Sequence, residues 1–212
     1  MAKAKVETST VISLSRINLK KLVVTVKGTS SLIVHKWSEK AKKQILSPGK
    51  IRNKAPEPRD PVRDFIDSAY WLSHEPKEKT EVGFEKAINA GATFGFPSIA
   101  FKKAVASAAY RNKLSKDKVS LMGAFYVDGE LVEIKSDTPI MREDMVILKN
   151  GSADIRFRPE FKNWTAELNI TYNADFFTPT VLVNLINLSG FSVGVGEWRP
   201  EKGGSFGMFE VV

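Results

Sequence analysis

The segment GFSVGVGEWRPEKGGSFGMFEVV, residues Gly190 to Val212, holds six of the fourteen glycines of the chain. Glycine adopts positive φ without steric cost and lets another backbone approach closely. The cluster therefore predicts either repeated tight turns, in a connection to a last strand, or contact with a partner. Trp198, Arg199 and Lys202 interrupt the glycines. These side chains can serve stacked bases and phosphates, and they can equally be ordinary surface residues.

Two clear elements precede this segment. Apolar and polar side chains alternate from Trp164 to Tyr172, which is the period of a half-buried strand, and Trp164 is assigned to the core. Thr178 is an expected N-cap and Pro179 an expected first-turn residue of an apolar helix over residues 181–188. A strand, a helix, the glycine-rich loop and a final strand over 208–212 thus close the chain.

The first half of the chain gives weaker signals. Residues 17–27 have the pattern of a central strand, and residues 32–34 form a second short apolar run. A short helix is expected over 39–46 with Ser38 as its cap, followed by a proline-rich insertion at about 48–91. A long helix is expected from Pro97 to about Leu114. Its buried stripe would contain Ile99, Phe101, Val105, Ala108 and Ala109, with Lys102, Lys103 and Arg111 toward its rim.

The middle of the chain predicts hairpins within a region of about 119–160. Asp128-Gly129 is the strongest local hairpin signal and would join strands at 121–127 and 131–134. Further strands are expected over 139–149 and 153–158, around Asn150-Gly151. On the second of these, Asp154, Arg156 and Arg158 would share the polar face. Without the insertions, the predicted order is β-α-β-β-α-β, the ferredoxin-like arrangement of an α+β protein shared by RNA-recognition folds.

Composition places the chain among globular proteins, with 42% hydrophobic and 26% charged residues in 212. We expect no membrane-spanning segment, no signal peptide and, without cysteine, no disulfide, which suits a cytoplasmic protein. The net charge of +8 is uneven, because residues 1–54 carry 13 Lys/Arg against 2 Asp/Glu. Such polarity suggests an electrostatic surface for a polyanion, or a basic tail beside a solvated helix face.

The final helix, the loop GVGEWRPEKGGSFG (194–207) and the closing strand resemble the signature of the RAMP superfamily. These are RNA-binding proteins of CRISPR effector complexes, and the likeness is nearest to the backbone subunits that polymerise along guide RNA. The stretches SSLIVHKWSEKAKKQ (30–44) and FGFPSIAFKKAVASAA (94–109), with the block from Leu185 onward, resemble a family of uncharacterised bacteriophage and prophage proteins. In this chain, residues 197–202 lengthen the loop and add two acids.

The resemblance implies one RAMP-like domain over residues 1–212, binding of single-stranded RNA or DNA, and self-association along the strand as a homo-oligomer or filament. It also implies the cytoplasm of a phage host as the location. The hairpin expected at Asp128-Gly129 would correspond to the protruding thumb of backbone subunits.

The sequence predicts no cofactor and no metal site; Asp60, Asp64 and Asp67 come nearest to a carboxylate set for Mg²⁺, a pattern that on a helix usually marks a solvated face. Two histidines, His35 and His74, stand without cysteines or carboxylates at ligand spacing, and no Walker loop, GxSxG elbow or dinucleotide fingerprint occurs. His35 is the one candidate for catalysis. RAMP nucleases of CRISPR RNA processing use a histidine for metal-free RNA cleavage, so the resemblance allows that role, while a histidine bonded to backbone or phosphate is the simpler interpretation.

The preferred hypothesis is a non-catalytic, single-stranded nucleic-acid binding protein. Its candidate binding residues are His35, Lys36, Trp37, Lys40, Lys42, Lys43, Lys50, Arg52, Lys54, Arg156, Arg158, Trp198, Arg199, Lys202, Gly203 and Gly204. The lysines and arginines would bind phosphates with release of counterions, and the tryptophans would stack on bases. Two alternatives remain: a phage protein–protein module for assembly or host inhibition, and a metal-independent ribonuclease that uses His35.

Overall fold

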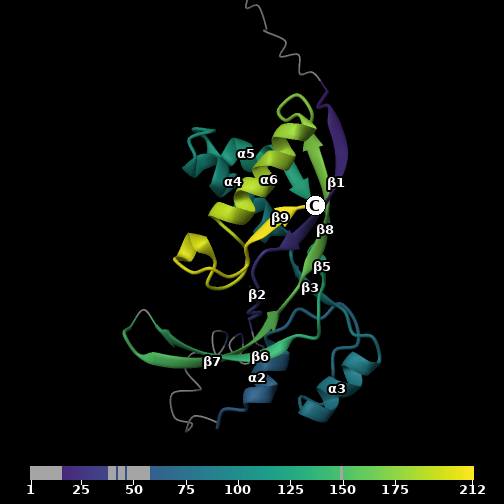
Figure 1. Cartoon of the computed structure of the whole chain (residues 1–212), viewed down its shortest axis with the longest axis vertical. Coiled ribbons are helices and arrows are strands. Elements are labelled where there is room, and N and C mark those ends of the chain that lie inside the picture. The colour runs from purple at the N-terminus through teal and green to yellow at the C-terminus, as the bar shows by residue number, and fades with distance from the viewer. Residues whose placement is uncertain (1–15, 38–41, 43–45, 47–57, 149) are drawn as a thin grey trace, which may run out of the picture.

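The computed structural model describes residues 16–37, 42, 46, 58–148 and 150–212. Figure 1 shows the elements of these residues. In chain order they are β1 (Leu19–Gly28), β2 (Leu32–Ile33), α2 (Pro61–Asp67), α3 (Glu81–Asn89), β3 (Phe94–Pro97), α4 (Ser98–Arg111), α5 (Lys118–Ala124), β4 (Phe125–Val127), β5 (Leu131–Lys135), β6 (Ile140–Ile147), β7 (Ala153–Phe161), β8 (Thr165–Asn173), α6 (Pro179–Ser192), the 3₁₀ turn η1 (Pro200–Lys202) and β9 (Phe209–Val211). The predicted α+β class is confirmed.

The main sheet has the strand order β3-β5-β8-β1-β9, and β4 also pairs with β8. Its pairings are antiparallel. β4 and β5 lie one after the other along the same edge of β8, so together they act as one interrupted strand. The series β1, α4, β4 with β5, β8, α6 and β9 has the predicted β-α-β-β-α-β order only when β3, an additional edge strand of the same sheet that precedes α4, is set aside.

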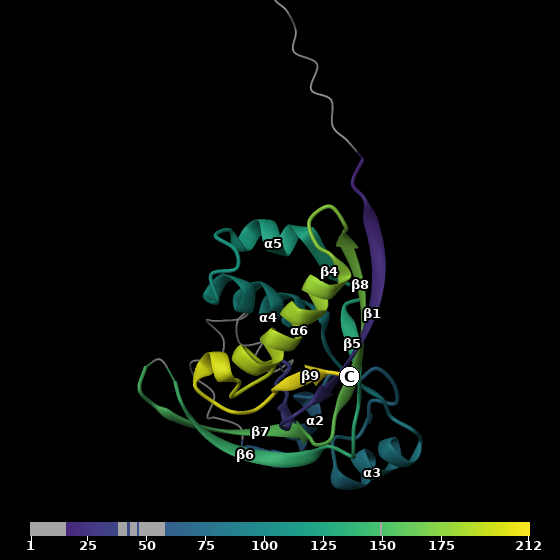
Figure 2. The ribbon, with the colours of Figure 1, turned by 45° about the horizontal axis from the view of Figure 1, so that its top comes forward.

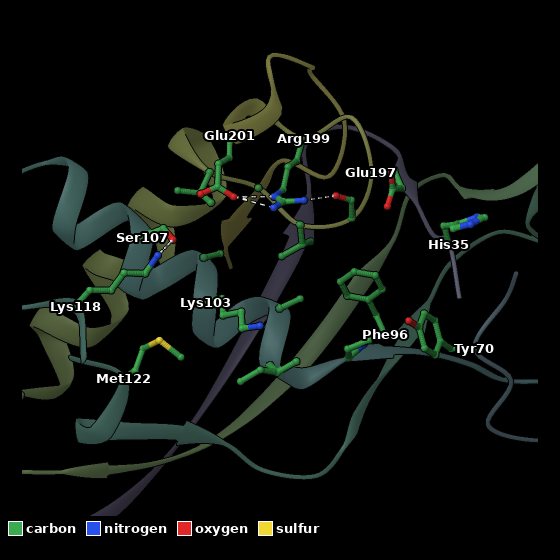
Figure 3. Close-up of a pocket in the computed structure, with 18 residues that line it drawn as sticks. His35, Tyr70, Phe96, Lys103, Ser107, Lys118, Met122, Glu197, Arg199 and Glu201 are labelled. Carbon is green, nitrogen blue, oxygen red and sulfur yellow. Dashed lines mark hydrogen bonds and ion pairs between the residues drawn. The ribbon is translucent and has the colours of Figure 1, made fainter. Parts of the chain in front are cut away.

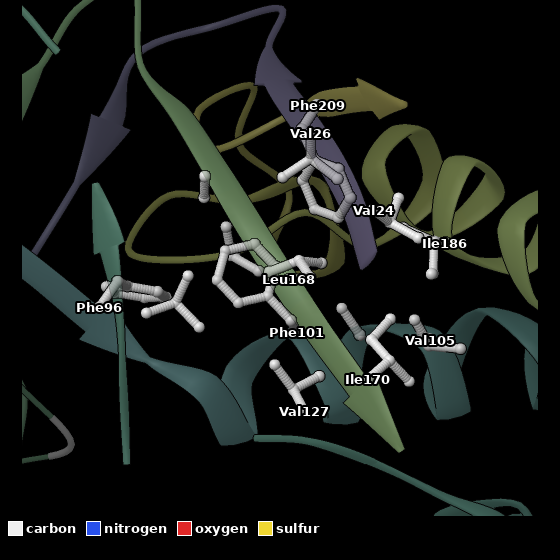
Figure 4. Close-up of a cluster of buried hydrophobic side chains, with 14 of the residues drawn as sticks. Val24, Val26, Phe96, Phe101, Val105, Val127, Leu168, Ile170, Ile186 and Phe209 are labelled. Carbon is white, nitrogen blue, oxygen red and sulfur yellow. The ribbon is translucent and has the colours of Figure 1, made fainter. Parts of the chain in front are cut away.

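Helices α4 and α6 cover one face of the main sheet (Figures 1 and 2). The side chains of β1 reflect this arrangement. Val24 and Val26 face the helices and are buried, whereas Val23 faces the other way and is 57% exposed. Phe101 from α4 and Ile186 from α6 pack on the buried face, as Figure 4 shows. The pattern of residues 17–27 thus marks a strand that is central in the sheet, between β8 and β9, with its second face toward solvent.

The local signals near the C-terminus are confirmed. In β8, Ala166, Leu168, Ile170 and Tyr172 are buried in alternation with exposed or half-buried polar residues. The Thr178 hydroxyl accepts a hydrogen bond from the Val181 N–H, 3.3 Å away, at the start of α6. Trp164 is fully buried, as expected, and its Nε1 donates to the Ser30 carbonyl at 2.8 Å.

A second, three-stranded sheet has the order β2-β7-β6. Strands β6 and β7 form a long hairpin, predicted at Asn150-Gly151, where Gly151 has φ 82°. Helix α2 packs on the base of this hairpin, with the Ser68 hydroxyl 3.1 Å from the Phe157 carbonyl. The two faces of the β6–β7 hairpin differ. One face carries Arg142, Asp144, Arg156 and Arg158, which agrees with the polar face predicted for β7.

The hairpin predicted at Asp128-Gly129 is wrong. Residues 121–124 belong to helix α5, which Asp117 caps by accepting from the Val119 N–H at 2.8 Å. β4 and β5 pair with β8 and not with each other, so Asp128 and Gly129 only form the break between them. The Asp128-Gly129 signal correctly predicted a turn, but it did not specify which strand the residues on either side would pair with.

Two further differences concern α4 and the insertion. Pro97 is the N-cap of α4 rather than a first-turn residue, and Ile99 is 45% exposed rather than part of the buried stripe. Lys102 is buried, with its Nζ 3.7 Å from the centre of the Tyr126 ring. Residues 58–91 of the expected insertion contain α2 and α3, while 48–57 and most of the short helix expected at 39–46 lie outside the described residues.

Candidate functional site

A groove with a cavity volume of about 420 Å³ runs along α4 beneath the glycine-rich loop (Figure 3). One wall is formed by α4 and the start of α5, with Lys103, Ser107 and Lys118. The loop over 193–201 forms the other wall, and His35, which follows β2, closes one end together with Tyr70. Residues far apart in the sequence thus meet at one concave site, the usual form of a ligand site.

The first glycines of the loop allow it to lie against β2. Gly196 has φ 79°, and a Cβ at this position would lie 2.5 Å from the Ile33 carbonyl oxygen. The Glu197 N–H donates to the same carbonyl at 2.9 Å. The sequence predicted either tight turns or contact with a partner. Gly196 has the positive φ of a tight turn, and the backbone that it approaches belongs to this chain rather than to a partner.

The later glycines close a second turn of the loop. Gly203 has φ 79° at the end of η1, and a Cβ on Gly204 would lie 1.8 Å from the Trp198 carbonyl oxygen. That carbonyl accepts from the Phe206 N–H at 3.0 Å, and Trp198 itself has φ 52°. The loop amides of residues 194, 195, 197, 201–204, 206 and 207 all donate to backbone carbonyls. The loop therefore presents mainly side chains, not a cradle of free amides, to the groove.

Arg199 lines the groove and is held by an acid of the same loop. Its Nη2 and Nε lie 2.8 and 3.1 Å from Glu201 Oε2, and its Nη1 donates to the Gly196 carbonyl at 3.0 Å. Arg111 of α4 contacts the other oxygen of Glu201 at 3.2 Å. Burial alone would raise the pKa of Glu201, but the hydrogen bond and charge of Arg199 outweigh it and hold this pKa below its ordinary value.

Arg158 lies in a network of ion pairs and is 1% exposed. Its Nη2 lies 2.7 Å from Asp144 Oδ2 in the hairpin, and its Nη1 lies 3.2 Å from Glu197 Oε2 in the loop. Asp144 also receives Arg142 Nε at 2.8 Å. The network joins the hairpin to the glycine-rich loop, and a phosphate would have to displace a carboxylate to reach Arg158.

His35 is half-buried at the end of the groove, and its Nδ1 has no hydrogen-bond partner in the described part of the chain. Burial, with the positive charge of Arg156 next in importance, lowers the pKa of His35 from its ordinary value. Burial, reinforced by Glu197, raises the pKa of Tyr70. Both side chains are therefore neutral at neutral pH.

The lysines that line the groove are the cations that sequence reasoning did not select. Lys103 is exposed and makes no ion pair with any described residue, and the Lys118 ammonium donates to the Ser107 hydroxyl at 2.7 Å. Arg111, Lys113, Lys116 and Lys202 are exposed around the same end, where α4, α5 and η1 meet. The run RNKLSKDK (111–118) was a visible signal, but its first residues were assigned to the end of the long helix and none of its residues to a site.

Of the residues predicted from the sequence, His35 and Arg199 line the groove. Trp198, Lys202, Gly203 and Gly204 lie on the glycine-rich loop but do not line the groove, and Arg158 is related to it through its contact with Glu197. Arg156 lies 3.5 Å from Asp154 in the hairpin. Lys36 and Trp37 follow His35, with Trp37 62% exposed, and Lys42 is exposed. The predicted residues Lys40, Lys43, Lys50, Arg52 and Lys54 lie outside the described residues.

The described residues contain no group of three or more His, Asp or Glu side chains placed to hold a metal ion. Within the same residues, no helix has both the length and the apolar character needed to cross a membrane.

No protein-family model matches the chain, and no curated protein matches it. Among solved structures, the chain is similar to Cmr6 from Pyrococcus furiosus with a TM-score of 0.38 and 12% sequence identity. The match covers 93% of this chain and 100% of that one. A TM-score this low carries no argument about function, so the case for function rests on the groove.

Proposed function

We propose that this protein binds single-stranded RNA or DNA without cleaving it, and that the strand lies along the groove between α4 and the glycine-rich loop. One observation carries the proposal: Lys103 and Lys118 line the groove without a carboxylate partner among the described residues, and exposed cations continue around its α5 end. Paired arginines contribute little net field, whereas lysines free of acids attract phosphates and release counterions.

The shape of the groove favours a single strand. A cavity of about 420 Å³ is in the range of pockets for small ligands, so it admits a nucleotide or two of an extended strand but not a duplex. Aromatic side chains, Phe96 and Tyr70, line the end opposite to Lys118. Cations beside aromatic rings are typical of sites that follow a backbone and stack bases.

The test is a binding titration by fluorescence anisotropy, with labelled RNA and DNA strands of about ten nucleotides. The variant Lys103→Glu/Lys118→Glu should lose at least about tenfold in affinity and flatten the salt dependence by roughly 1.4, since each lost phosphate contact removes about 0.7 from the slope. Lys77→Glu/Lys86→Glu is the matched control with the same change in charge, because both lysines are exposed and neither lines the groove. Equal binding by both variants would exclude the groove, and no binding by the wild type would end the proposal.

Self-association along the strand belongs to the same proposal, as the resemblance to backbone subunits implies. The outer face of the hairpin offers a surface for it, because Met145 and Ile147 are each 68% exposed and Ile155 is 43% exposed. Mass photometry with and without a long strand should show assemblies that Met145→Ser/Ile147→Ser weakens. Monomers only, with strands of any length, would contradict this part.

A metal-independent ribonuclease is the second candidate, because His35, Tyr70 and Lys103 line one groove. A neutral His35 can accept the proton of a ribose 2′-hydroxyl as its oxygen attacks the adjacent phosphorus, and the leaving 5′-oxygen can take a proton from the Lys103 ammonium. This candidate predicts cleavage of RNA, but not DNA, in the presence of a chelator. Loss of that cleavage in His35→Ala would support it, and intact RNA after long incubation with wild type would exclude it.

A further inference from the structure

The end of the groove near His35 has a different chemistry from the lysine end. Figure 3 shows Lys118 and Met122 at one end and His35 with Tyr70 at the other, with Arg199 between them. Tyr70 and Phe96 form an edge-to-face pair with ring centres 6.3 Å apart and an angle of 84°. This end therefore has an aromatic wall and, among the described residues that line it beside Tyr70, no lysine or arginine, so it suits a base rather than a phosphate.

Glu197 supplies a fixed hydrogen-bond acceptor at this end. Its side chain is 42% exposed, and one of its oxygens is held by the buried Arg158 at 3.2 Å. Its other oxygen has no partner among the described residues. An ionised carboxylate only accepts hydrogen bonds, and it repels both phosphates and carbonyl oxygens. A group that binds here must present N–H donors.

His35 adds a second unsatisfied polar atom. Its Nδ1 is buried without a partner, and a buried polar atom of this kind costs free energy until a ligand or water satisfies it. Glu197 acts on the titration of both His35 and Tyr70, which places the three side chains within electrostatic range of one another. The four side chains of this end therefore combine one aromatic wall with one open hydrogen-bonding position, the second oxygen of Glu197, while His35 Nδ1 is shielded from solvent.

We propose that this end of the groove takes one unstacked base of the bound strand, and that Glu197 selects guanine. The Watson–Crick edge of guanine has two adjacent N–H donors, which match the acceptors of a carboxylate. Adenine and cytosine present one amino donor beside a ring acceptor, and uracil presents one N–H between two carbonyls, so each places an acceptor against Glu197. Proteins that read single strands commonly hold a splayed base on this edge between apolar side chains.

This inference rests on the proposed binding of single strands, and its readout is a ratio between ligands. Anisotropy titrations compare a uridine decamer with strands of the same length that carry one central G, A or C. The wild type should bind the G strand about tenfold more tightly than the uridine strand, with A and C between them. In Glu197→Gln that preference should fall to about twofold or less, because an amide replaces one acceptor with a donor.

Glu75→Gln is the matched control, since it likewise removes one carboxylate charge, from a side chain that is 48% exposed and paired with Lys79 outside the groove. It should leave the G preference unchanged. A competition series with free GMP, AMP, CMP and UMP on the wild type repeats the test without any variant that might misfold, and GMP should displace the labelled strand best. Strands bound with equal affinity whatever the central base, or a G preference that survives Glu197→Gln, would overturn the inference and leave the proposed function standing. Absence of binding to every strand would overturn both.

Discussion

The guanidinium of Arg158 joins the hairpin to the glycine-rich loop, because its two terminal nitrogens contact Asp144 at 2.7 Å and Glu197 at 3.2 Å. Arg158 is 1% exposed, so if its side chain is removed, bulk water cannot solvate the carboxylates that it contacts. We predict that Arg158→Met destabilises the protein by about 2–4 kcal/mol, at the lower end for a broken buried pair since Arg142 still contacts Asp144. Urea unfolding followed by tryptophan fluorescence measures this.

The control for Arg158 is Arg63→Met, which removes a surface pair whose Nε–Oδ2 distance to Asp67 is 3.8 Å and whose arginine is 63% exposed. Its cost should stay below about 1 kcal/mol. If both variants unfold at the same urea concentration, the buried network makes no special contribution.

Gly190 lets helix α6 lie directly against β9. A Cβ at this position would lie 1.8 Å from the Phe209 carbonyl oxygen, a backbone atom that cannot move aside alone. Gly190→Ala should therefore destabilise the fold by about 2–4 kcal/mol through forced separation of the two elements.

Gly123→Ala should change the stability in the opposite direction, because Gly123 lies in α5 with nothing within 4 Å of its Cβ position. That change should stabilise the protein by about 0.5–1 kcal/mol through helix propensity. Thermal unfolding of both variants measures these effects: the Tm should fall in Gly190→Ala and rise in Gly123→Ala, and an unchanged Tm in Gly190→Ala would contradict the close contact of α6 with β9.

Much of the fold could be predicted because its signals are local. The alternation from Ala166 to Tyr172 and the cap at Thr178 depend only on neighbours in sequence, and both are confirmed. Asp128-Gly129 shows the limit of such signals. Both flanking strands pair with β8 (Thr165–Asn173), and β5 also pairs with β3, and no local pattern in residues 121–135 specifies those pairings.

The site was less predictable for a related reason. Periodicity correctly placed Arg158 on the polar face of β7, but a residue on a polar face is normally exposed, whereas Arg158 is buried and paired with acids of the hairpin and the loop. Lys103 and Lys118 were visible as charges, yet only the packing of α5 beside α4 brings them into one groove with the loop. The composition and pattern of the sequence do not contain the distance between these two lysines, so their place in one groove could not be predicted.

Glu201 neutralises Arg199 and Arg111 at the edge of the groove, and we predict that Glu201→Gln strengthens binding of single strands by about threefold. The amide keeps the shape of the side chain while it removes a negative charge that repels phosphates. Anisotropy titrations at about 50 and about 200 mM salt should also show a steeper salt dependence. Glu75→Gln, on an exposed pair with Lys79 away from the groove, should change neither quantity. Weaker binding by Glu201→Gln would instead mean that the carboxylate holds Arg199 in a productive position.

The pKa of His35 predicts how stability changes with pH. Burial and then Arg156 lower this pKa, while Glu197 and Asp154 raise it and Arg158 lowers it further. Because the folded pKa lies below the unfolded value of 6.5, the unfolded chain binds a proton at mildly acidic pH that the folded chain does not. The contribution of His35 is therefore fully present above pH 6.5 and is lost as pH falls toward its folded pKa. Urea unfolding at about pH 7 and about pH 5 should show a smaller loss of stability in His35→Gln than in the wild type, since glutamine binds no proton in this range. An equal loss in both proteins would mean that His35 takes up its proton without cost, and that its imidazole is more solvated than its position beneath the glycine-rich loop implies.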